Sequence, residues 1–576
     1  MSAKPFIPTD QQKRIIEHGG SAFISACPGA GKTQVMVERA RRDRSGPGRG
    51  RGVAFLSFTL AAASELEDRL RRESLIDTPP FPHFIGTFDS FLWQLLIAPF
   101  GVDGCADKPR LIPDKDARDI QPYDRAQVLK LECFDRKSGA AIEDKLRRAN
   151  FRGSVKAHET AARNLRQRLL DRGELDFADA REIALARLLD PVSGAVLASA
   201  LAGRFEELVV DEAQDCNPVD LEIITWFRSA GTSVKVICDP NQAIYSFRGG
   251  ATQELTAFAA TFTADERLPM SGNFRSSQHI ARAIVALRPP RERALIDDAL
   301  GEFRNEPTPV QILSYTGKGG VPAAIGVKFH ELTDAMGLVA EDCPVVAATR
   351  RTGANALGHP PDGGVQDLSY RLAAAISDFH FSFELGGRKE ALEAIHRIML
   401  QVGDRLGPRT YHQYLSDTAT EANDWRPEAL AVADALRFTS DRFATAQLWL
   451  DHARRLLEPL LAADGGTIKQ KLKWNDGLAA ALAANPTSGH PARTIHSVKG
   501  MEFPAVCVVM TTATAKGILD TLSAVGSGDD NEDARKIYVG ASRAQRLLVL
   551  ALPRTQADRM RSLMTGVGAA VVVTQI

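Results

Sequence analysis

The stretch SACPGAGKT, residues 25–33, limits what this 576-residue chain can fold into more than any other part of it. A short apolar run, AFIS, leads into the stretch, and TQVMVERARR follows with the composition of a helix. Strand, glycine-rich loop and helix are the context of a phosphate-binding loop. The pattern therefore predicts an α/β domain that binds a nucleotide, with a chance glycine turn as the alternative.

The residue types in this loop suit a nucleoside triphosphate. Gly29 and Gly31 let backbone N–H groups approach phosphate oxygens, and the dipole of the following helix favours negative charge. Lys32 is expected to reach the β- and γ-phosphates, and the Thr33 hydroxyl to bind Mg²⁺. The residues predicted to surround the nucleotide are Ala26, Cys27, Pro28, Gly29, Ala30, Gly31, Lys32, Thr33 and Gln34. ATP and Mg²⁺ are the predicted cofactors.

A second feature is the acidic end of FEELVVDEAQD, residues 205–215, whose first half is an apolar strand. At the tip of that strand Asp211 can hold Mg²⁺ through water. Its neighbour Glu212 can orient and deprotonate the attacking water. The alternative is an acidic first turn of a helix. Taken with the loop, the acidic stretch predicts an ATPase.

Length and composition narrow the class further. A chain of 576 residues exceeds one hydrophobic core, so several domains are expected. No run of about 20 apolar residues is present, so no membrane helix is expected. Seven scattered Cys without a C-x-x-C pair argue against a zinc ribbon or a disulfide framework and indicate a reducing, cytoplasmic compartment. Lys plus Arg equals Asp plus Glu at 71 each, which neither supports nor excludes a nucleic-acid partner.

The motif VDEAQD resembles the Walker B motif of the UvrD/Rep-type DNA helicases of superfamily 1. In that family the phosphate loop usually opens with Ala, as it does here at Ala26. Other family motifs follow in order from about Ile7 to Leu550, while the two regions between them match poorly. The resemblance implies that Gln11 reads the adenine edge through its side-chain amide, a donor and an acceptor together.

The resemblance also implies the groups that contact DNA. FLSFTLAAASEL, residues 55–66, matches a motif in which Phe58 and Thr59 touch the single strand. In VICDPNQAIYSFRGG, residues 236–250, the residues implied to face DNA are Tyr245, Phe247 and Arg248. His496, in RTIHSVKGMEFPAVCVV, is a further DNA contact candidate. Aromatic platforms stack on bases without sequence preference. A core aromatic cluster is the alternative for the Tyr245 loop.

The remaining residues of the family pattern complete the ATP site. Gln242 is implied to sense the γ-phosphate, Phe274 to stack on adenine and Arg275 to reach the γ-phosphate. Glu502 is implied to accept a hydrogen bond from the ribose, and Arg543 to act as a second arginine finger. The predicted catalytic set is Lys32, Glu212, Gln242, Arg275 and Arg543, and the predicted metal ligands are Thr33 and Asp211.

The fold that follows is α/β, with two RecA-like P-loop NTPase domains built on parallel sheets. Residues 1–92 and 201–268 are predicted to form the first core domain and residues 93–200 its helical insert. Residues 269–380 and 485–576 are predicted to form the second core domain, with 381–484 as a short helical insert. The insert of the second core is short for the family, where the corresponding domain regulates unwinding.

The predicted function is an ATP- and Mg²⁺-dependent helicase or translocase that moves along single-stranded DNA. The resemblance implies that it travels 3′ to 5′ and unwinds duplex DNA that bears a single-stranded tail. An alternative is a helicase-like, DNA-sensing ATPase that controls a separate nuclease subunit, as in compact UvrD-like proteins of Gabija-type antiviral systems. The short second insert and the 26 residues that follow Leu550, too few for a fused nuclease, motivate this alternative. A non-catalytic DNA-binding scaffold is a third possibility. Sequence leaves the pathway, DNA repair or antiviral defence, open.

Overall fold

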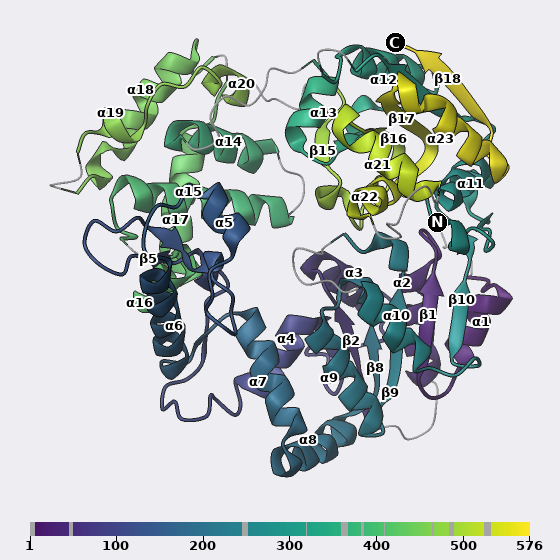
Figure 1. Ribbon diagram of the computed structural model, residues 1–576, viewed down its shortest axis with the longest axis horizontal. Helices are drawn as coiled ribbons and strands as arrows, with labels where there is room; N and C mark the ends of the chain where they lie inside the picture. The colour runs from purple at the N-terminus through teal and green to yellow at the C-terminus, as the bar shows by residue number, and fades with distance from the viewer. Residues whose placement is uncertain are drawn as a thin grey trace. The chain divides into compact units, whose positions relative to one another are not determined.

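The structure is a computed structural model that describes residues 6–44, 50–244, 252–317, 320–358, 367–381, 385–407, 409–439, 441–462, 466–482, 489–523 and 531–576. Its contacts divide the chain into two compact units (Figure 1). Residues 1–91, 185–361 and 488–576 form one, called here the core unit. Residues 92–184 and 362–487 form the other, called the insert unit.

The first sheet of the core unit has six parallel strands in the order β10-β1-β9-β8-β2-β3. The strands are β1 (Ala22–Ala26), β2 (Gly52–Ser57), β3 (Phe84–Thr87), β8 (Phe205–Val210), β9 (Ser233–Cys238) and β10 (Arg267–Met270). Parallel strands are covered on both faces, so they read as continuous apolar runs. This order places β1, β9 and β8 side by side, which brings the loops at their carboxyl ends together.

The second sheet of the core unit is also parallel, in the order β15-β14-β16-β17-β13-β18. Its strands are β13 (Val310–Tyr315), β14 (Val345–Ala347), β15 (Ala492–Thr494), β16 (Phe503–Val509), β17 (Ala544–Pro553) and β18 (Val571–Gln575). A separate short parallel pair joins β11 (Gly272–Asn273) to β12 (Asp298–Ala299). Thus residues about 200 positions apart in the chain share one sheet.

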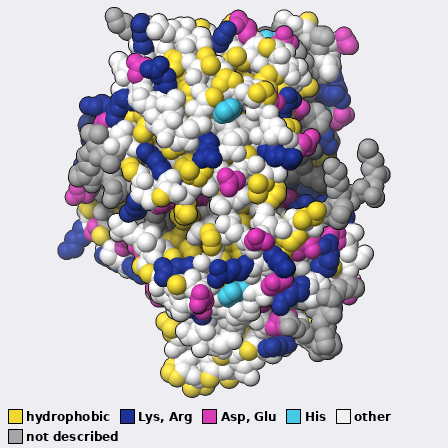
Figure 2. All heavy atoms as spheres, turned by 90° about the vertical axis from the view of Figure 1, so that its right-hand side faces the viewer, with side chains coloured by type: hydrophobic (Ala, Val, Ile, Leu, Met, Phe, Trp, Pro, Cys, Tyr) yellow, Lys and Arg dark blue, Asp and Glu magenta, His cyan; other side chains and the backbone are white. Residues whose placement is uncertain are grey.

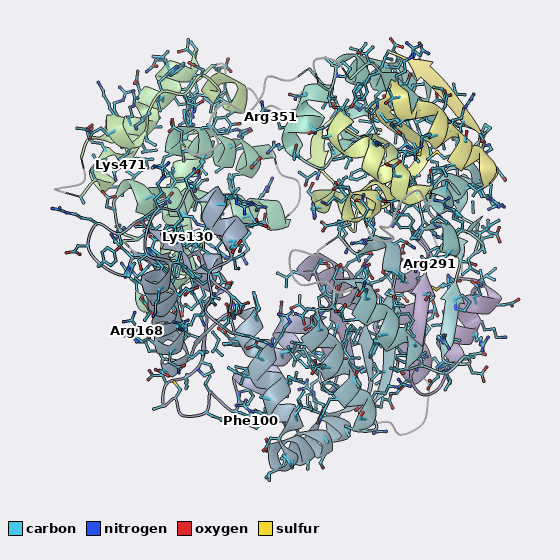
Figure 3. The ribbon with its side chains drawn as sticks, viewed as in Figure 1. Phe100, Lys130, Arg168, Arg291, Arg351 and Lys471 are labelled. Atoms are coloured by element: carbon cyan, nitrogen blue, oxygen red, sulfur yellow. The ribbon has the colours of Figure 1, made fainter. Side chains whose placement is uncertain are left out.

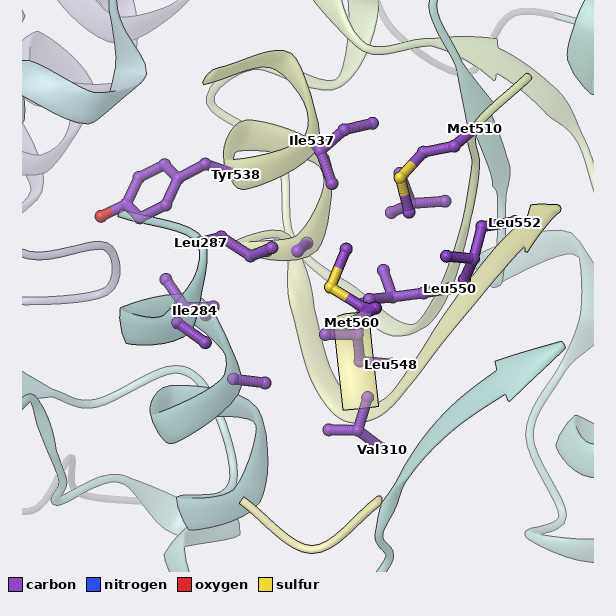
Figure 4. Packing of buried hydrophobic residues seen from close by; sticks show 14 of the residues in the cluster. Ile284, Leu287, Val310, Met510, Ile537, Tyr538, Leu548, Leu550, Leu552 and Met560 are labelled. Carbon is purple, nitrogen blue, oxygen red and sulfur yellow. The ribbon is translucent and has the colours of Figure 1, made fainter. Parts of the chain in front are cut away.

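Helices cover both faces of these sheets (Figure 1). Those of the core unit are α1 (Asp10–Glu17), α2 (Lys32–Arg44), α3 (Leu60–Arg72), α8 (Pro191–Arg204), α9 (Pro218–Ser229), α10 (Thr252–Ala260), α11 (Gln278–Ala286), α12 (Ala324–Ala335), α13 (Arg350–Ala356), α21 (Thr512–Leu522), α22 (Glu532–Ala541) and α23 (Arg554–Gly566). On one face of the second sheet, Ile284 of α11, Ile537 of α22 and Met560 of α23 pack against Leu548 and Leu550 (Figure 4). On the other face Phe329 of α12 packs against the same sheet.

The insert unit is mainly helical. Its helices are α5 (Glu143–Arg148), α6 (Val155–Asp171), α14 (Leu368–Phe381), α15 (Leu385–Val402), α16 (Tyr411–Asp417), α17 (Ala422–Ala435), α18 (Ala446–Leu457), α19 (Ile468–Lys471) and α20 (Leu478–Leu482). Two more, α4 (Phe88–Leu92) and α7 (Phe177–Leu189), cross the boundary between the units. The strands β4 (Arg110–Leu111), β5 (Asp119–Ile120), β6 (Leu129–Lys130) and β7 (Glu174–Leu175) form two small pairs. Trp449, which is fully buried, lies in the main hydrophobic cluster of this unit.

Polar contacts inside the insert unit join its two chain segments. Thr410 donates to the Asp114 carboxylate at 2.7 Å, and Arg110 lies 2.7 Å from the buried Glu174 carboxylate and 3.4 Å from Asp417. Residues 92–184 and 362–487 therefore fold against each other within one unit.

The α/β class with parallel sheets and helical insertions is confirmed. The four-part division of the chain stays a prediction, and the structure differs from it at two helices. Helix α8 groups with the core unit, whereas α14 groups with the insert unit, where Leu372 and Ile376 pack against Ile395 of α15. The apolar face of α14 is buried by that contact.

Over the described residues no single helix is long and apolar enough to cross a membrane, although α7 and α8 together, bent by 96° at their junction, reach that length and composition.

Surface charge is mixed on the face drawn in Figure 2, where Lys and Arg side chains alternate with Asp and Glu. Several exposed lysines are paired locally. In the insert unit Lys130 lies 2.5 Å from Asp119 and Lys471 lies 2.6 Å from Asp404 (both lysines are labelled in Figure 3). Exposed pairs of this kind contribute about 0–1 kcal/mol each to stability.

Candidate ATP and DNA site

The glycine-rich loop connects β1 to α2, as the sequence predicts. Gly29 has a φ of 70° and Gly31 a φ of 79°, in the left-handed region that glycine tolerates best. A Cβ on Gly29 would lie 2.6 Å from the Cβ of Arg275, so the loop admits no side chain there. The Gly29 carbonyl accepts a hydrogen bond from the Phe274 N–H at 2.8 Å. The residues after β11 therefore lie directly on the loop.

Lys32 begins α2 and points at the acidic residues after β8. Its Nζ lies 2.6 Å from Glu212 Oε1 and 3.6 Å from Asp211 Oδ1. Burial disfavours the charge of Lys32, but the two carboxylates outweigh it and hold the pKa of Lys32 above its usual value. The three groups thus form one charged cluster at the point where a phosphate is expected.

The two carboxylates of this cluster differ in their environment. Burial acts to raise the pKa of Glu212, but the charges of Lys32 and Lys499 prevail and lower it well below its usual range. Burial and the charge of Glu212 raise the pKa of Asp211, although Lys32, 3.6 Å away, opposes the shift. Glu212 also has a φ of 57°, a strained value for a non-glycine residue. Glu212 therefore keeps its negative charge beside Lys32.

The predicted metal ligands share a small cavity. Thr33 and Asp211 line a space of about 30 Å³, together with Ser57, Glu65 and several apolar side chains. Such a space holds one water-sized species. The Ser57 hydroxyl is buried there with no hydrogen-bond partner among the described residues. A hydroxyl and a carboxylate are the oxygen ligands that Mg²⁺ prefers, so the residues present fit the predicted ion.

Gln242 and Arg543 meet although they come from different sheets. Gln242 follows β9 at the carboxyl edge of the first sheet, and Arg543 precedes β17 at the amino edge of the second. The Arg543 guanidinium donates to Gln242 Oε1, and both side chains are buried. Burial lowers the pKa of Arg543 to about 10, which leaves it charged at neutral pH.

Arg275 also reaches across to the second sheet. It donates to the Ser542 carbonyl at 2.8 Å and to Glu502 Oε1 at 2.6 Å. Its Nε is buried and makes no hydrogen bond among the described residues. An unsatisfied cationic donor beside the glycine-rich loop suits a phosphate oxygen.

Gln11 and Phe274 lie at the other end of the loop. Gln11 Oε1 accepts from the Ser271 N–H at 2.8 Å, one residue before β11. The Phe274 ring lies within 4.0 Å of the position that a Cβ on Gly31 would take. The structure therefore brings most of the predicted nucleotide residues together around one loop.

Comparison with known sequences identifies the family to which this chain belongs. The sequence model of the UvrD/REP helicase N-terminal domain matches residues 8–263, and that of the UvrD-like helicase C-terminal domain matches residues 491–555. Together these matches cover more than half of the chain. The chain belongs to the UvrD/Rep helicase family. Both matched regions contribute residues to the site described above.

Individual relatives agree with this family. The ATP-dependent DNA helicase UvrD2 of Mycobacterium tuberculosis is 25% identical over 96% of this chain and 79% of the relative. The putative ATP-dependent DNA helicase YjcD of Bacillus subtilis is 20% identical over 95% and 78%. The Gabija protein GajB of Bacillus cereus is 23% identical over 47% of each chain. The helicase relatives support DNA helicase activity for this UvrD-like chain.

The structure describes only some of the residues that are predicted to contact DNA in this UvrD-like chain. Phe58 is half-buried and stacks on Phe88, with ring centroids 5.6 Å apart. The Thr59 hydroxyl accepts from the Ala62 N–H at 3.3 Å and so caps α3. His496 Nε2 lies 3.2 Å from the Ile244 carbonyl oxygen. The candidates Tyr245, Phe247 and Arg248 lie outside the described residues.

Three further residues tie the motifs together and were not among the predicted site residues. Gln214 donates to Glu212 and accepts from the Asp239 N–H at 3.1 Å, linking the loops after β8 and β9. Lys499 lies 2.6 Å from the nearer carboxylate oxygen of Asp215. Burial raises the pKa of Asp215 to about 6, although Lys499 opposes this shift. Their positions inside DEAQD and HSVKG were the available signal, because each stands within two or three residues of a predicted site residue.

Proposed function

We propose that this chain is an ATP- and Mg²⁺-dependent motor that moves 3′ to 5′ along single-stranded DNA and unwinds duplex that bears a single-stranded tail. The observation that carries the proposal is the contact between Gln242 and Arg543, which joins the two core sheets at the nucleotide loop. A site assembled from both sheets can change when ATP is bound or hydrolysed. Membership of the UvrD/Rep family supports the same activity.

The chain's own groups have distinct parts in ATP hydrolysis. Lys32 moves from the carboxylates to the β- and γ-phosphates, which frees Glu212 to orient and deprotonate water. Arg275 and Arg543 neutralise charge that develops on the γ-phosphoryl group. Thr33 and Asp211 would hold Mg²⁺, which would supply neutralisation of phosphate charge.

The segment after β9 connects this chemistry to DNA. Asp239 and Gln242 stand in the ATP site, and Ile244, two residues on, contacts His496. The chain then continues into Tyr245. Only three positions of the chain therefore separate Gln242 from Tyr245, so a movement of Gln242 can be passed on to the predicted stacking residues. Because stacking does not select sequence, no sequence specificity is expected from this platform.

The test is ATP hydrolysis with and without single-stranded DNA, together with unwinding of duplexes that carry a 3′ or a 5′ tail. The expected result is hydrolysis stimulated by DNA and unwinding from the 3′ tail alone. Unwinding from the 5′ tail would reverse the proposed polarity. Equal hydrolysis by wild type and Lys32→Ala would contradict the motor and favour a non-catalytic scaffold.

A second candidate function rests on the similarity to the Gabija protein GajB. Here the chain is a DNA-sensing ATPase subunit that regulates a separate nuclease in a bacterial antiviral complex. This candidate predicts stimulated hydrolysis without unwinding from either tail, and co-purification of a nuclease from the native host. A chain that unwinds alone and purifies without such a partner would exclude it.

A further inference from the structure

A buried tyrosine that packs with the second core sheet, Tyr538, contacts the loop that follows β9 of the first core sheet. Tyr538 lies on α22, five residues before Arg543, and is fully buried. Its ring packs at the edge of the hydrophobic cluster, and its hydroxyl points away from Ile284 and Leu287 (Figure 4). The hydroxyl reaches Asp239 Oδ2 at 3.0 Å. One phenol therefore bridges α22 and the loop after β9.

Asp239 is the centre of the contacts that orient Gln242. Its Oδ2 also accepts from Gln242 Nε2 at 2.9 Å, and its Oδ1 accepts from the Asn241 N–H at 3.1 Å. The other end of the Gln242 amide, Oε1, accepts from Arg543. With its nitrogen held by a carboxylate and its oxygen by a guanidinium, the amide has one orientation. If the amide were rotated by 180°, its N–H groups would face the guanidinium donor and its oxygen would face the carboxylate acceptor.

The surroundings of Tyr538 keep the phenol in the donor state. Burial, reinforced by the negative charge of Asp239, raises the pKa of Tyr538 well above its usual value. Arg288 lies 6.0 Å from the centre of the ring and pairs with the buried Asp297. Burial raises the pKa of Asp239, and the charge of Arg288 opposes that shift. Tyr538 and Arg288 are thus the groups from the second core that stabilise a buried carboxylate of the first.

We infer that Tyr538 is a positioning residue for ATP hydrolysis, which fixes Asp239 and through it the side-chain amide of Gln242. Tyr538 acts through Asp239, the carboxylate that its hydroxyl contacts. The inference rests on the proposed function, because it assigns Gln242 a part in hydrolysis. The inference adds a requirement. Helix α22 must bring the Tyr538 hydroxyl to Asp239 for the Gln242 side chain to be oriented.

The test is Tyr538→Phe, which removes one oxygen and keeps the ring. The expected result is a fall of about tenfold in DNA-stimulated kcat, the size expected when one hydrogen bond to a charged group is lost. The Kd for a fluorescent ADP is expected to stay within twofold, because Tyr538 lies away from the glycine-rich loop and Gln242 faces the γ-phosphate. This separation of kcat from nucleotide affinity would not arise from a general loss of folding.

Tyr315→Phe is the matched control. Tyr315 is also buried in the second core, and its hydroxyl donates to the Met510 carbonyl at 2.6 Å, away from the ATP site. Both variants are expected to lower the melting temperature, but Tyr315→Phe is expected to retain kcat. If the two variants have equal kcat, Tyr538 is structural and the inference is overturned.

Asp239→Asn tests the same contact from its other side and keeps the test decisive if Tyr538→Phe does not fold. It is expected to reduce kcat and to retain ADP affinity. If Tyr538 acts through Asp239, the double variant is no slower than Asp239→Asn alone. Additive losses would overturn the inference. An inactive wild type would instead reject the proposed function, and this role with it.

Discussion

The core unit and the insert unit each hold a lysine against acidic side chains, and they use it differently. In the core unit Lys32 lies 2.6 Å from Glu212 and 3.6 Å from Asp211, at the end of the glycine-rich loop. In the insert unit Lys115 is fully buried and pairs with Asp179 and with the Glu174 carbonyl. Under the proposed function the first lysine exchanges its carboxylates for the nucleotide, whereas the second has only partners within the protein.

The neighbours of the two lysines reinforce this difference. Arg136 in the insert unit lies within 3.1 Å of carboxylate oxygens of Asp116, Asp176 and Asp179. The positive and negative charges of this cluster therefore offset one another. In the core unit Arg275 retains a buried Nε without a hydrogen bond among the described residues. Arg166 Nε, beside Asp116 in the insert unit, is likewise buried without a hydrogen bond among the described residues, so the two sites differ by the neighbouring glycine-rich loop and not by an unpaired donor alone.

The largest expected effect lies in the core unit. Arg543→Ala is expected to lower kcat for ATP by about 10³-fold or more, because an arginine at the developing phosphoryl charge contributes that much. Stopped-flow or steady-state phosphate release measures it. Arg546→Ala is the control, since Arg546 lies three residues on and pairs with Glu306 at 3.0 Å, outside the ATP site. If the two variants lost the same factor in kcat, Arg543 would have no specific role in ATP hydrolysis.

The next effect separates chemistry from binding at Lys32. Lys32→Ala is expected to reduce kcat/KM by at least about 10²-fold, as for removal of one charged donor to the transition state. Single-turnover hydrolysis measures it. The variant also leaves Asp211 and Glu212 without their cation, so the free energy of unfolding is expected to fall as well. Added ATP and Mg²⁺ are expected to raise the melting temperature of wild type and not of the variant.

Lys115→Ala is the counterpart in the insert unit. Removing the fully buried Lys115 is expected to cost up to about 3 kcal/mol of stability, because Asp179 then keeps only Arg136 as a cation partner. Urea unfolding followed by tryptophan fluorescence measures the loss. In the fraction that remains folded, kcat is expected to be unchanged.

Lys130→Ala controls for loss of a lysine from the same unit. Lys130 is half exposed and pairs with an exposed Asp119, so the expected change is within about 0.5 kcal/mol. If Lys130→Ala destabilised the unit as much as Lys115→Ala, burial would not explain the difference between the two lysines.

The sequence predicts the core unit better than the insert unit, for physical reasons. The phosphate loop, DEAQD and CDPNQ each follow a strand, and the apolar runs of β1, β8 and β9 mark those ends. What sequence does not predict is which distant residues meet: Lys32 and Glu212 are 180 positions apart, and Gln242 and Arg543 are 301 apart. In the insert unit, helical spacing predicts helices, but no local pattern indicates that α14 packs on α15 or that Lys115 meets Asp179.

The smallest expected effect is an opposite response of the two units to acid. In the insert unit His396 stacks on Trp425, 4.7 Å between ring centres, and burial lowers the pKa of His396 to about 4. Its unfolded value is about 6.5. The unfolded state therefore binds a proton first, so stability falls as the pH drops from 6.5 towards 4. In the core unit burial raises the pKa of Asp215 to about 6, and there acidification below pH 6 adds stability.

His396→Gln should remove part of the acid sensitivity of the insert unit. Fluorescence melting curves at pH 7 and pH 5 measure this, because Trp93, Trp425, Trp449 and Trp474 lie in the insert unit and only Trp226 lies in the core unit. The wild-type melting temperature is expected to fall by more between these pH values than that of His396→Gln. Asp215→Asn is the matched variant, and it is expected to remove a stabilising contribution at pH 5 instead. If both variants shifted the pH dependence in the same direction, the two units would not differ in how their buried groups bind protons.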